Sequence, residues 1–502
     1  MVKDKRRNIL LILAYAYILL PFLIFTMGWM KIYIAIPIIV ILLFCFWKIC
    51  KESGKLWMPE LSKDNVIRIL FIISVIAIWV YMSGIGKFLF QNTDHGARNT
   101  IFSILVEYDW PVINHAILPK NKGVFHTTGL IYYIGYWLPS AVIGKLFGLR
   151  IGYYAQAVWA VLGIALVYYF ICVKAKKVVV WPLWIFIFFS GLDAVGVFLT
   201  NADIAAYETI WHSEWWSVPY QYSSMTTQLF WAFNQAIPAW LCTMLVLIQK
   251  NNRNLVFILA CCMLSSTFPF VGLFILTLFI YFTRQYDSLL QYKTAACTVR
   301  FREYFKALLK DTCTIQNVLG GGIIGIFSFL YLIGNSSGGR MFQEDPRGPA
   351  YYNSLPKLVL FLILEVGIYA ALLYKYNKDN KLYYFVILCL CIIPPIKVGY
   401  SNDFCMRVSI PFLLVVMLFV IHAVKTSWEK KDYSIFAGLI AVLVIGSITP
   451  VLELKRTWTY TFERINTDEI VYMKDGDPIV VLNSTNFSGD IENNFFYKYI
   501  AK

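Results

Sequence analysis

Long apolar runs are the feature that most limits what this chain can fold into. They recur from Ile9 to Pro450, and many reach about 18 residues, the length at which a helix crosses the hydrocarbon layer. In lipid, only helices and closed barrels satisfy every backbone polar group, and these runs are continuous rather than alternating. The sequence therefore predicts an all-α polytopic membrane protein with about 11–13 transmembrane helices.

The composition agrees with a membrane protein. Of the 502 residues, 59% are hydrophobic and 15% are charged, whereas a soluble protein carries about 25% charged residues. The formal net charge is +15, but Lys and Arg gather between the apolar runs and form no basic domain. This spacing follows the positive-inside rule. We therefore expect membrane lipids, and not nucleic acid, as the surroundings of the chain.

The placement of Lys and Arg sets the expected orientation. The basic start, Met1–Arg7, puts the N-terminus in the cytoplasm, and the Lys-rich connector Lys48–Arg68 lies on the same side. The run Ile67–Gly86 then leads to a first external loop over residues 87–127. Within this loop we expect a short surface helix near Asn99–Tyr108.

A strict alternation of passes fails at two places. Two apolar runs, Thr128–Gly148 and Ile151–Val173, precede the basic cluster Lys174–Lys177, and two crossings would leave that cluster outside. Farther on, Arg253 and Arg284 both look cytoplasmic, yet one long apolar run separates them. Each conflict disappears if one segment is re-entrant, and the second disappears equally if the run is a tight hairpin.

The apolar runs also set the domain organisation. A transmembrane domain covers residues 1–450, and a small external C-terminal segment covers residues 451–502. Because this segment is too short for a core of its own, we expect it to dock on the external loops. The stretch Pro478–Asn483 within it has the pattern of a short strand.

Asp94 is the main catalytic candidate. It lies in the polar segment Gln91–Asn99, directly after the third apolar run, where water, headgroups and lipid-linked substrates meet. A carboxylate there could take the proton from an acceptor hydroxyl during sugar transfer, with His95 and Arg98 as substrate-binding neighbours. The alternative is that Asp94 or a residue just before it only caps the following helix.

The chain around Asp94 carries a series of motifs. Trp110–Val112 follows, then His126–Tyr133, and then Gly144–Gly148 with the sequence Gly-Lys-Leu-Phe-Gly. Over the stretch from Ile67 to Lys177 this order resembles the polytopic GT-C glycosyltransferases of the mannosyltransferase and aminoarabinose-transferase type. In that family a His/Lys-Pro-Pro-Leu-Tyr-Tyr segment leads to a Lys-Leu-Phe-Gly-like end.

The resemblance implies a polyprenyl-phosphate-sugar donor, an inverting transfer at the outer face and the loop Asp as catalytic base. Two departures stand out. Asp94 is followed by His95 and not by a second acid, and Thr127-Thr128 replaces the two prolines. These departures leave open the exact donor and whether a divalent cation is the cofactor.

Further candidates lie in two external segments. His126, at the entry to the next run, either contacts a donor phosphate or only starts a helix. The loop Tyr207–Tyr222 is rich in aromatic residues, which stack on sugar rings, and its Glu208 and His212 could bind sugar hydroxyls or a divalent cation. The alternative for the tryptophans of this loop is an interfacial belt.

Two arginines of the later external loops are candidates for binding phosphate, because guanidinium groups hold phosphate oxygens bidentately. Arg407 lies at a membrane boundary, with Asp403 expected to orient it. Arg340 either binds the same phosphate as Arg407 or pairs with the acidic residues that follow Arg340 in a solvated loop.

Together these residues predict an integral-membrane glycosyltransferase. It would move a sugar from a polyprenyl-phosphate donor to a cell-envelope glycan or lipid acceptor at the outer face of a bacterial inner membrane. One alternative is a surface-polysaccharide polymerase that depends on two arginine-bearing loops. The other is a transporter or flippase of lipid-linked sugars, for which broken helices near Pro269 and Pro394-Pro395 would be typical.

Overall fold

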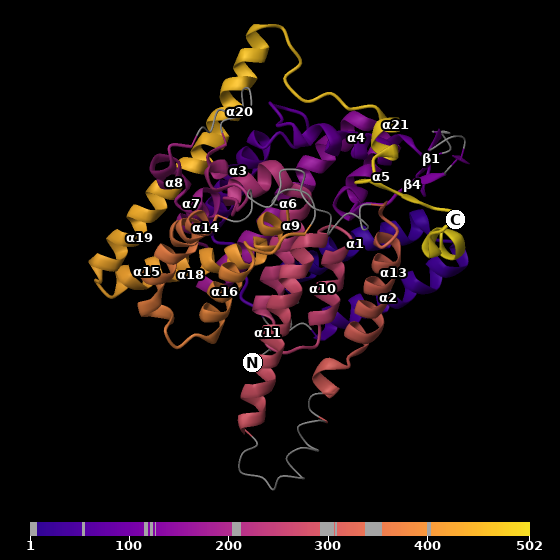
Figure 1. Cartoon of the computed structure of the whole chain (residues 1–502). Helices are drawn as coiled ribbons and strands as arrows, with labels where there is room; N and C mark the ends of the chain where they lie inside the picture. Colours follow the sequence, from indigo (N-terminus) through magenta and orange to yellow (C-terminus); the bar gives the residue numbers. More distant parts are fainter. Residues whose placement is uncertain are drawn as a thin grey trace.

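The computed structural model describes residues 8–52, 56–114, 119–120, 124–125, 127–202, 212–291, 306, 309–336, 354–398 and 403–502. Helices dominate this part of the chain (Figure 1). The prediction of an all-α polytopic membrane protein is therefore confirmed.

Ten helical segments among the described residues are long and apolar enough to cross a membrane. They are α1 (Ile9–Trp29), α2 (Ile32–Glu52), α3 (Lys63–Met82), α6 (Leu149–Ala175), α7 with α8 (Trp181–Phe188 and Asp193–Thr200), α9 (Met225–Ile248), α11 (Thr267–Gln291), α14, η6 and α15 (Leu355–Leu362, Ile363–Gly367 and Ile368–Asn377), α18 (Ile410–Glu429), and α19 with α20 (Tyr433–Gly446 and Ile448–Asn466).

Three shorter apolar pieces add to these: α10 (Leu255–Met263), η3 with α13 (Gln316–Gly321 and Gly322–Leu332), and α16 (Lys381–Ile392). Helix α10, with 9 residues, is too short for a full pass, so the described part of the chain holds ten full-length candidate spans and two shorter apolar ones. The remaining helices are α4 (Asp94–Glu107), η1 (Gly135–Trp137), α5 (Leu138–Phe147), η2 (Ser213–Ser217), α17 (Asp403–Val408), α21 (Pro478–Asn483) and η7 (Phe496–Ile500).

Side-chain caps start several spans where the sequence offers them. Asn8 accepts from the backbone of α1, Ser62 from α3 and Ser224 from α9. Each cap satisfies one N–H that the first helical turn leaves without a partner.

The length of α5 resolves the conflict at the two apolar runs Thr128–Gly148 and Ile151–Val173, which could not both cross the membrane. This helix has 10 residues and rises about 15 Å, half of the roughly 30 Å of hydrocarbon. It packs beside α4, where a Cβ on Gly144 would lie 2.7 Å from Val106. Only α6 therefore makes a full pass, and Lys174 lies at the end of the bundle opposite α4.

A helical hairpin resolves the conflict at the apolar run between Arg253 and Arg284. Helix α10 has only 9 residues, and α11 returns beside it after the turn at Ser265-Ser266. The guanidinium of Arg284 on α11 donates to the carbonyl of Asn251, at 3.0 Å, just before α10. Both basic ends of this run therefore lie on the same side, as a tight hairpin requires.

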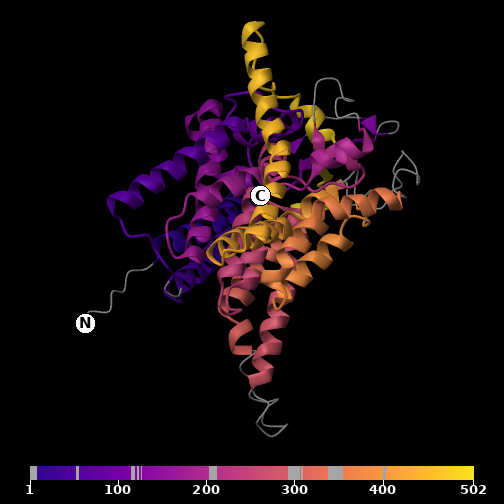
Figure 2. The same ribbon diagram turned by 90° about the vertical axis from the view of Figure 1, so that its left-hand side faces the viewer.

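The C-terminal part departs from two predictions. The last span does not end at Pro450, because α20 continues to Asn466 and stands out from the bundle (Figure 2). The predicted strand Pro478–Asn483 is wrong, since these residues form α21. The side chain of Asp477 accepts from the N–H of Ile479, and Pro478 occupies the first turn, where its missing N–H costs nothing.

The C-terminal segment docks on the chain that follows α3, where a docking site was predicted (Figure 1). Its strand β5 (Ser488–Asp490) pairs antiparallel with β4 (Thr128–Leu130), which also pairs with β1 (Ile113–Asn114). Strands β2 (Pro119–Lys120) and β3 (Val124–Phe125) form a separate pair. Lys87 binds Asp475 at 2.5 Å. This docking covers α4 with residues from the far end of the chain.

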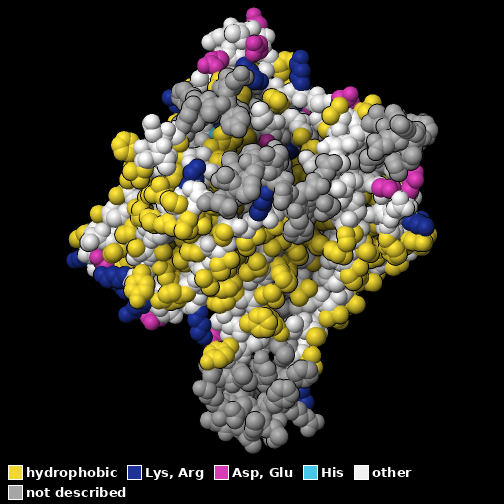
Figure 3. All heavy atoms as spheres, viewed as in Figure 1, with side chains coloured by type: hydrophobic (Ala, Val, Ile, Leu, Met, Phe, Trp, Pro, Cys, Tyr) yellow, Lys and Arg dark blue, Asp and Glu magenta, His cyan; other side chains and the backbone are white. Residues whose placement is uncertain are grey.

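Apolar side chains form a broad band across the face seen in Figure 3, with most charged groups above or below it. The most buried spans are α9, α18 and α6, which form the centre of the bundle. Side chains such as Ile36 and Phe198 are more than half exposed, as residues facing lipid chains should be.

Candidate active site

Asp94 is the first residue of α4, five residues before the predicted start of the surface helix. Its carboxylate accepts a hydrogen bond of 2.9 Å from the Nη2 of Arg98. The two side chains meet because residues four apart lie on one face of a helix. The preceding residue, Thr93, is the N-cap and makes no side-chain cap bond. Asp94 therefore pairs with Arg98 and does not cap the helix.

Asp403 and Arg407 of α17 repeat this arrangement, with 3.1 Å between carboxylate and guanidinium. In both pairs the carboxylate is open, with 43% of the Asp94 and 38% of the Asp403 side chain exposed, and the arginine is buried, with 9% and 11% exposed. Each pair thus offers an accessible acid in front of a guanidinium that is shielded from solvent.

The two pairs belong to one cluster. Although part of its side chain is exposed, the protein around Asp403 removes water from the carboxylate and raises its pKa; the positive charges of Arg407 and Arg98 lower this pKa, and the negative charge of Asp94 raises it further. The net effect is a raised pKa. The pair on α4 and the pair on α17, about three hundred residues apart in sequence, therefore lie near enough for their charges to influence one another.

Two tyrosines complete the arrangement. The hydroxyl of Tyr133 accepts from Arg407 at 3.4 Å and from Gln235 at 3.2 Å, and it also accepts from the hydroxyl of Tyr132. The rings of the two tyrosines lie 3.6 Å apart between centroids. We call this group the two-arginine cluster; its members are Asp94, Arg98, Tyr132, Tyr133, Gln235, Asp403 and Arg407.

Buried polar atoms of the cluster have no hydrogen-bond partner among the described residues. They are Nη1 of Arg98, Nε of Arg407 and Oε1 of Gln235. A buried donor without an acceptor costs about 1–3 kcal/mol, and more when it is charged. An oxyanion bound to either guanidinium would satisfy its open donor, and phosphate oxygens match guanidinium groups in geometry.

His95 points away from this cluster into the protein. Its Nε2–H donates to the carbonyl of Phe230 at 3.1 Å, and its Nδ1 accepts from Gln91 at 3.1 Å. Burial and the charge of Arg98 lower the pKa of His95 to about 3. The ring is therefore neutral and ties α4 to α9, with neither nitrogen left for a substrate.

Several predicted site residues lie outside the described residues. They are His126, Glu208 and Arg340.

His212 is described and is almost fully buried. Its Nδ1 lies 3.0 Å from Glu453 of α20, and its Nε2 lies 3.7 Å from Glu214. Glu453 also accepts from Trp231 and from Arg456. Within the described part of the chain, no three His, Cys, Asp or Glu side chains are placed to hold a metal ion. His212 thus ties its loop to α20.

The aromatic loop does not form the expected interfacial belt at Trp216. This side chain is buried, and its indole N–H donates to Asp193 at 3.2 Å. The reason is the polar interior of α7–α8, where Asp193 also accepts from Ser190 and Thr449, both at 3.0 Å. An indole N–H next to a buried carboxylate contributes more there than at the membrane surface.

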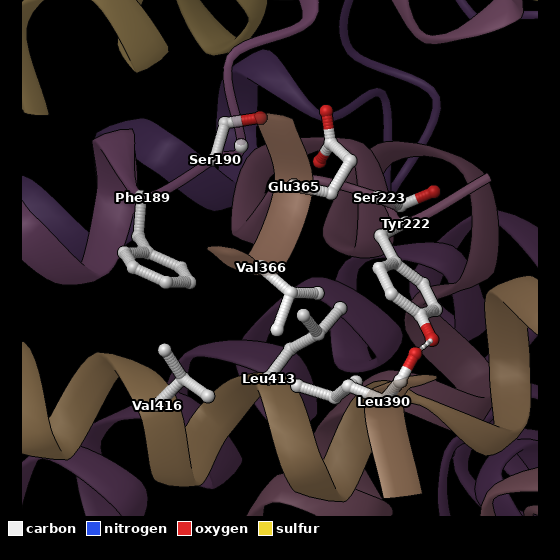
Figure 4. A pocket seen from close by; sticks show the side chains of 10 residues that line it. Phe189, Ser190, Tyr222, Ser223, Glu365, Val366, Leu390, Leu413 and Val416 are labelled. Carbon is white, nitrogen blue, oxygen red and sulfur yellow. Dashed lines mark hydrogen bonds between the residues drawn. The ribbon is translucent and has the colours of Figure 1, made fainter. Parts of the chain in front are cut away.

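A small cavity of about 10 Å³ adjoins this polar interior (Figure 4). Glu365, Ser190 and Ser223 are among the residues that line it. Glu365 also lies close enough to Asp193 for a hydrogen bond between the two acids. The backbone of Gly191 is covered by the same carboxyl group, so that a Cβ there would lie 1.7 Å from it.

Glu214 should make stability depend on pH. Burial raises its pKa from 4.5 to about 7, Asp193 adds to this effect and His212 opposes it. A raised pKa favours the protonated acid in the folded state, so the stabilisation is present below pH 4.5 and is lost as the pH rises towards 7. Thermal unfolding of the purified protein should therefore show a midpoint that falls over this window, with a smaller fall in Glu214→Gln. Glu469→Gln, an exposed change, should keep the wild-type slope; equal slopes in all three proteins would contradict the assignment.

Sequence reasoning identified both acid–arginine pairs but missed Tyr132 and Tyr133 as site residues. A signal was present, because two adjacent hydroxyl-bearing rings follow a polar segment at the entry to a span. Fold and site together define a polytopic membrane protein with a two-arginine cluster at one end of its helical bundle. Comparison with known proteins gave no match: no family model, curated protein or solved structure is significantly similar to this chain.

Proposed function

We propose that this protein is an integral-membrane glycosyltransferase. It moves a sugar from a polyprenyl-phosphate donor to a cell-envelope glycan or lipid at the outer face of a bacterial inner membrane. The observation that carries the proposal is the two-arginine cluster, where two open carboxylates stand in front of two buried arginines, each with a nitrogen that has no hydrogen-bond partner among the described residues.

The charges of the opposite end of the bundle support this orientation. Lys174 lies in the last turn of α6 and Lys177 just after this helix, and Lys425, Lys430 and Lys431 lie near the end of α18. Cytoplasmic ends of membrane proteins carry an excess of Lys and Arg. The two-arginine cluster, at the other end of α18, then faces outward.

In the proposed reaction, Arg98 and Arg407 hold the phosphate of the donor. The acceptor hydroxyl attacks the anomeric carbon from the face opposite the phosphate, so its oxygen forms a bond to that carbon as the carbon–oxygen bond to phosphate breaks. Asp94 takes the hydroxyl proton. The leaving polyprenyl phosphate gains a negative charge, which the two guanidinium groups stabilise.

Asp403 and Tyr133 act as positioning residues in this scheme. Both bind the guanidinium of Arg407, on different nitrogens. Their contacts leave its Nε as the atom without a described partner. A phosphate oxygen at that nitrogen would complete the set.

Replacing Arg407 with Lys should weaken use of the donor. Lysine keeps the charge but loses the planar fork that binds Asp403, Tyr133 and a phosphate at the same time. We expect a fall of about tenfold to a hundredfold in kcat/KM, since hydrogen bonds to charged groups contribute about 1.5–3 kcal/mol each. The measurement is transfer from a polyprenyl-phosphate sugar by the purified protein in lipid vesicles. Arg150→Lys, a largely exposed arginine at the start of α6, is the control and should keep wild-type transfer. Unchanged kinetics in Arg407→Lys would refute the phosphate-binding role.

The transporter alternative is favoured by one observation, the acidic side chains buried within spans. Asp193 and Glu365 lie together there, and intramembrane acids often mark transport paths. A surface-polysaccharide polymerase would depend on arginine-bearing loops and not on Asp94 as a base. Transport of a lipid-linked sugar without any transfer would favour the first of these alternatives.

A further inference from the structure

A large groove lies at the end of the bundle opposite the two-arginine cluster. Its volume is about 920 Å³, and it is bounded by α6, α7, α9, α15, α16, α18 and α19. Helix α18 connects the two regions, since it begins just after Arg407 and its last turn lines the groove. The lining follows α18 from Val415 to Glu429, and the charged end of the groove at Lys425 lies most of the length of α18 away from Arg407.

Positive charge dominates one wall of the groove. Lys174 and Lys177 line it from α6 and the residues that follow, and Lys425 lines it from α18. Glu429 is the one acid among the described lining residues, and it pairs with Lys425 at 3.8 Å. In Figure 3, Lys and Arg side chains gather near the lower ends of α15 and α19.

Charged side chains beside the groove add to the positive charge of this wall. The ammonium of Lys430 lies 5.7 Å from the ring centroid of Tyr376, a lining residue. The nearby acid Asp432 is already paired with Lys375. No described acid is therefore left to neutralise Lys174 and Lys177.

The remaining walls are apolar and open towards the lipid. Leu247, Val415 and Phe419 lie among the lining residues. Trp181 and Trp428, also in the lining, are 38% and 59% exposed. Tryptophans with one edge apolar and one edge wet are typical of the headgroup level of a bilayer.

We propose that this groove binds an anionic glycerophospholipid of the surrounding bilayer. Its phosphate and headgroup would lie against Lys174, Lys177 and Lys425, and the upper parts of its acyl chains would cover the apolar walls. Charge complementarity selects the anionic headgroup, and basic pockets between spans on the cytoplasmic side are suited to such lipids. An apolar wall open to lipid fits acyl chains better than a soluble anion.

This occupant would contact helices that lie far apart in the sequence. The groove touches seven helices that extend from α6 to α19 in sequence. A lipid that binds the folded bundle, but not the unfolded chain, stabilises the fold in proportion to its occupancy. The proposal does not depend on the glycosyltransferase function.

The test uses the full-length protein in detergent and counts bound lipids by native mass spectrometry, with thermal unfolding as a second readout. We expect phosphatidylglycerol to bind and to raise the unfolding temperature, and phosphatidylcholine to do neither. In Lys174→Gln/Lys177→Gln the apparent Kd for phosphatidylglycerol should rise at least tenfold. Added salt should weaken binding to the wild type, because the headgroup contacts lie at the surface.

The matched control is Lys48→Gln/Lys51→Gln, which removes two lysines from the end of α2 on the same side of the bundle. It should bind phosphatidylglycerol as the wild type does. Equal binding of both lipids, or an unchanged Kd in the groove variant, would overturn the proposal. So would displacement of phosphatidylglycerol by an equimolar amount of polyprenyl phosphate, because the groove would then belong to the carrier.

Discussion

The Asp94→Asn variant should lose sugar transfer by roughly 10²- to 10⁴-fold, the range that a positioned general base contributes. Asparagine cannot take the acceptor proton, yet its side-chain oxygen still accepts from Arg98. Because Asp94 is about two-fifths exposed, the change should alter the free energy of unfolding by no more than about 1 kcal/mol. The measurement is initial rate of transfer in vesicles, together with the yield and unfolding temperature of the purified variant.

The control for this experiment is Asp477→Asn. This residue caps α21, in the segment that docks on the same end of the bundle, and asparagine is an equally good cap. Its transfer rate should match the wild type. Wild-type transfer by a well-folded Asp94→Asn protein would rule out Asp94 as the base. Lipid-linked sugar transport that persists in this variant would support the transporter alternative.

The Gly272→Ala variant should destabilise the bundle and impair the site together. A Cβ at this position of α11 would lie 2.1 Å from the carbonyl oxygen of Val408 and 3.4 Å from the ring of Phe412. Backbone cannot rotate away as a side chain can, so α11 and α17 must separate. Such overpacking costs about 1–3 kcal/mol, and an ångström-scale displacement of a reacting group can cost about a hundredfold in rate. Thermal unfolding and donor kinetics of the same preparation measure both effects.

Gly322→Ala is the matched change. No heavy atom lies within 4 Å of a Cβ built on Gly322 at the start of α13, and alanine favours a helix by up to about 1 kcal/mol over glycine. This variant should be as stable as the wild type or more so, with unchanged transfer. If Gly272→Ala behaved in the same way, the close packing of α11 against α17 would be disproved.

The membrane class and most spans could be predicted because they depend on local composition. The two acid–arginine pairs could also be found, since each follows the four-residue spacing of a helix. The error at Pro478–Asn483 came from weighing β-branched residues above the Asp-Pro start that caps α21. The apolar pattern left open whether the segment of α5 crosses the membrane or is re-entrant, and the structure shows a helix that is too short to cross.

The sequence by itself determined that this chain crosses a membrane many times, because each apolar run must satisfy its own backbone within lipid. Only the tertiary structure decided that α4, the Tyr132-Tyr133 segment, α9 and α17 meet in one cluster. Residues facing lipid and residues facing protein are both apolar in a span, as Leu42 and Leu43 show, one fully buried and the other 49% exposed. Hydrophobicity therefore marks the spans but does not tell which of their faces come together.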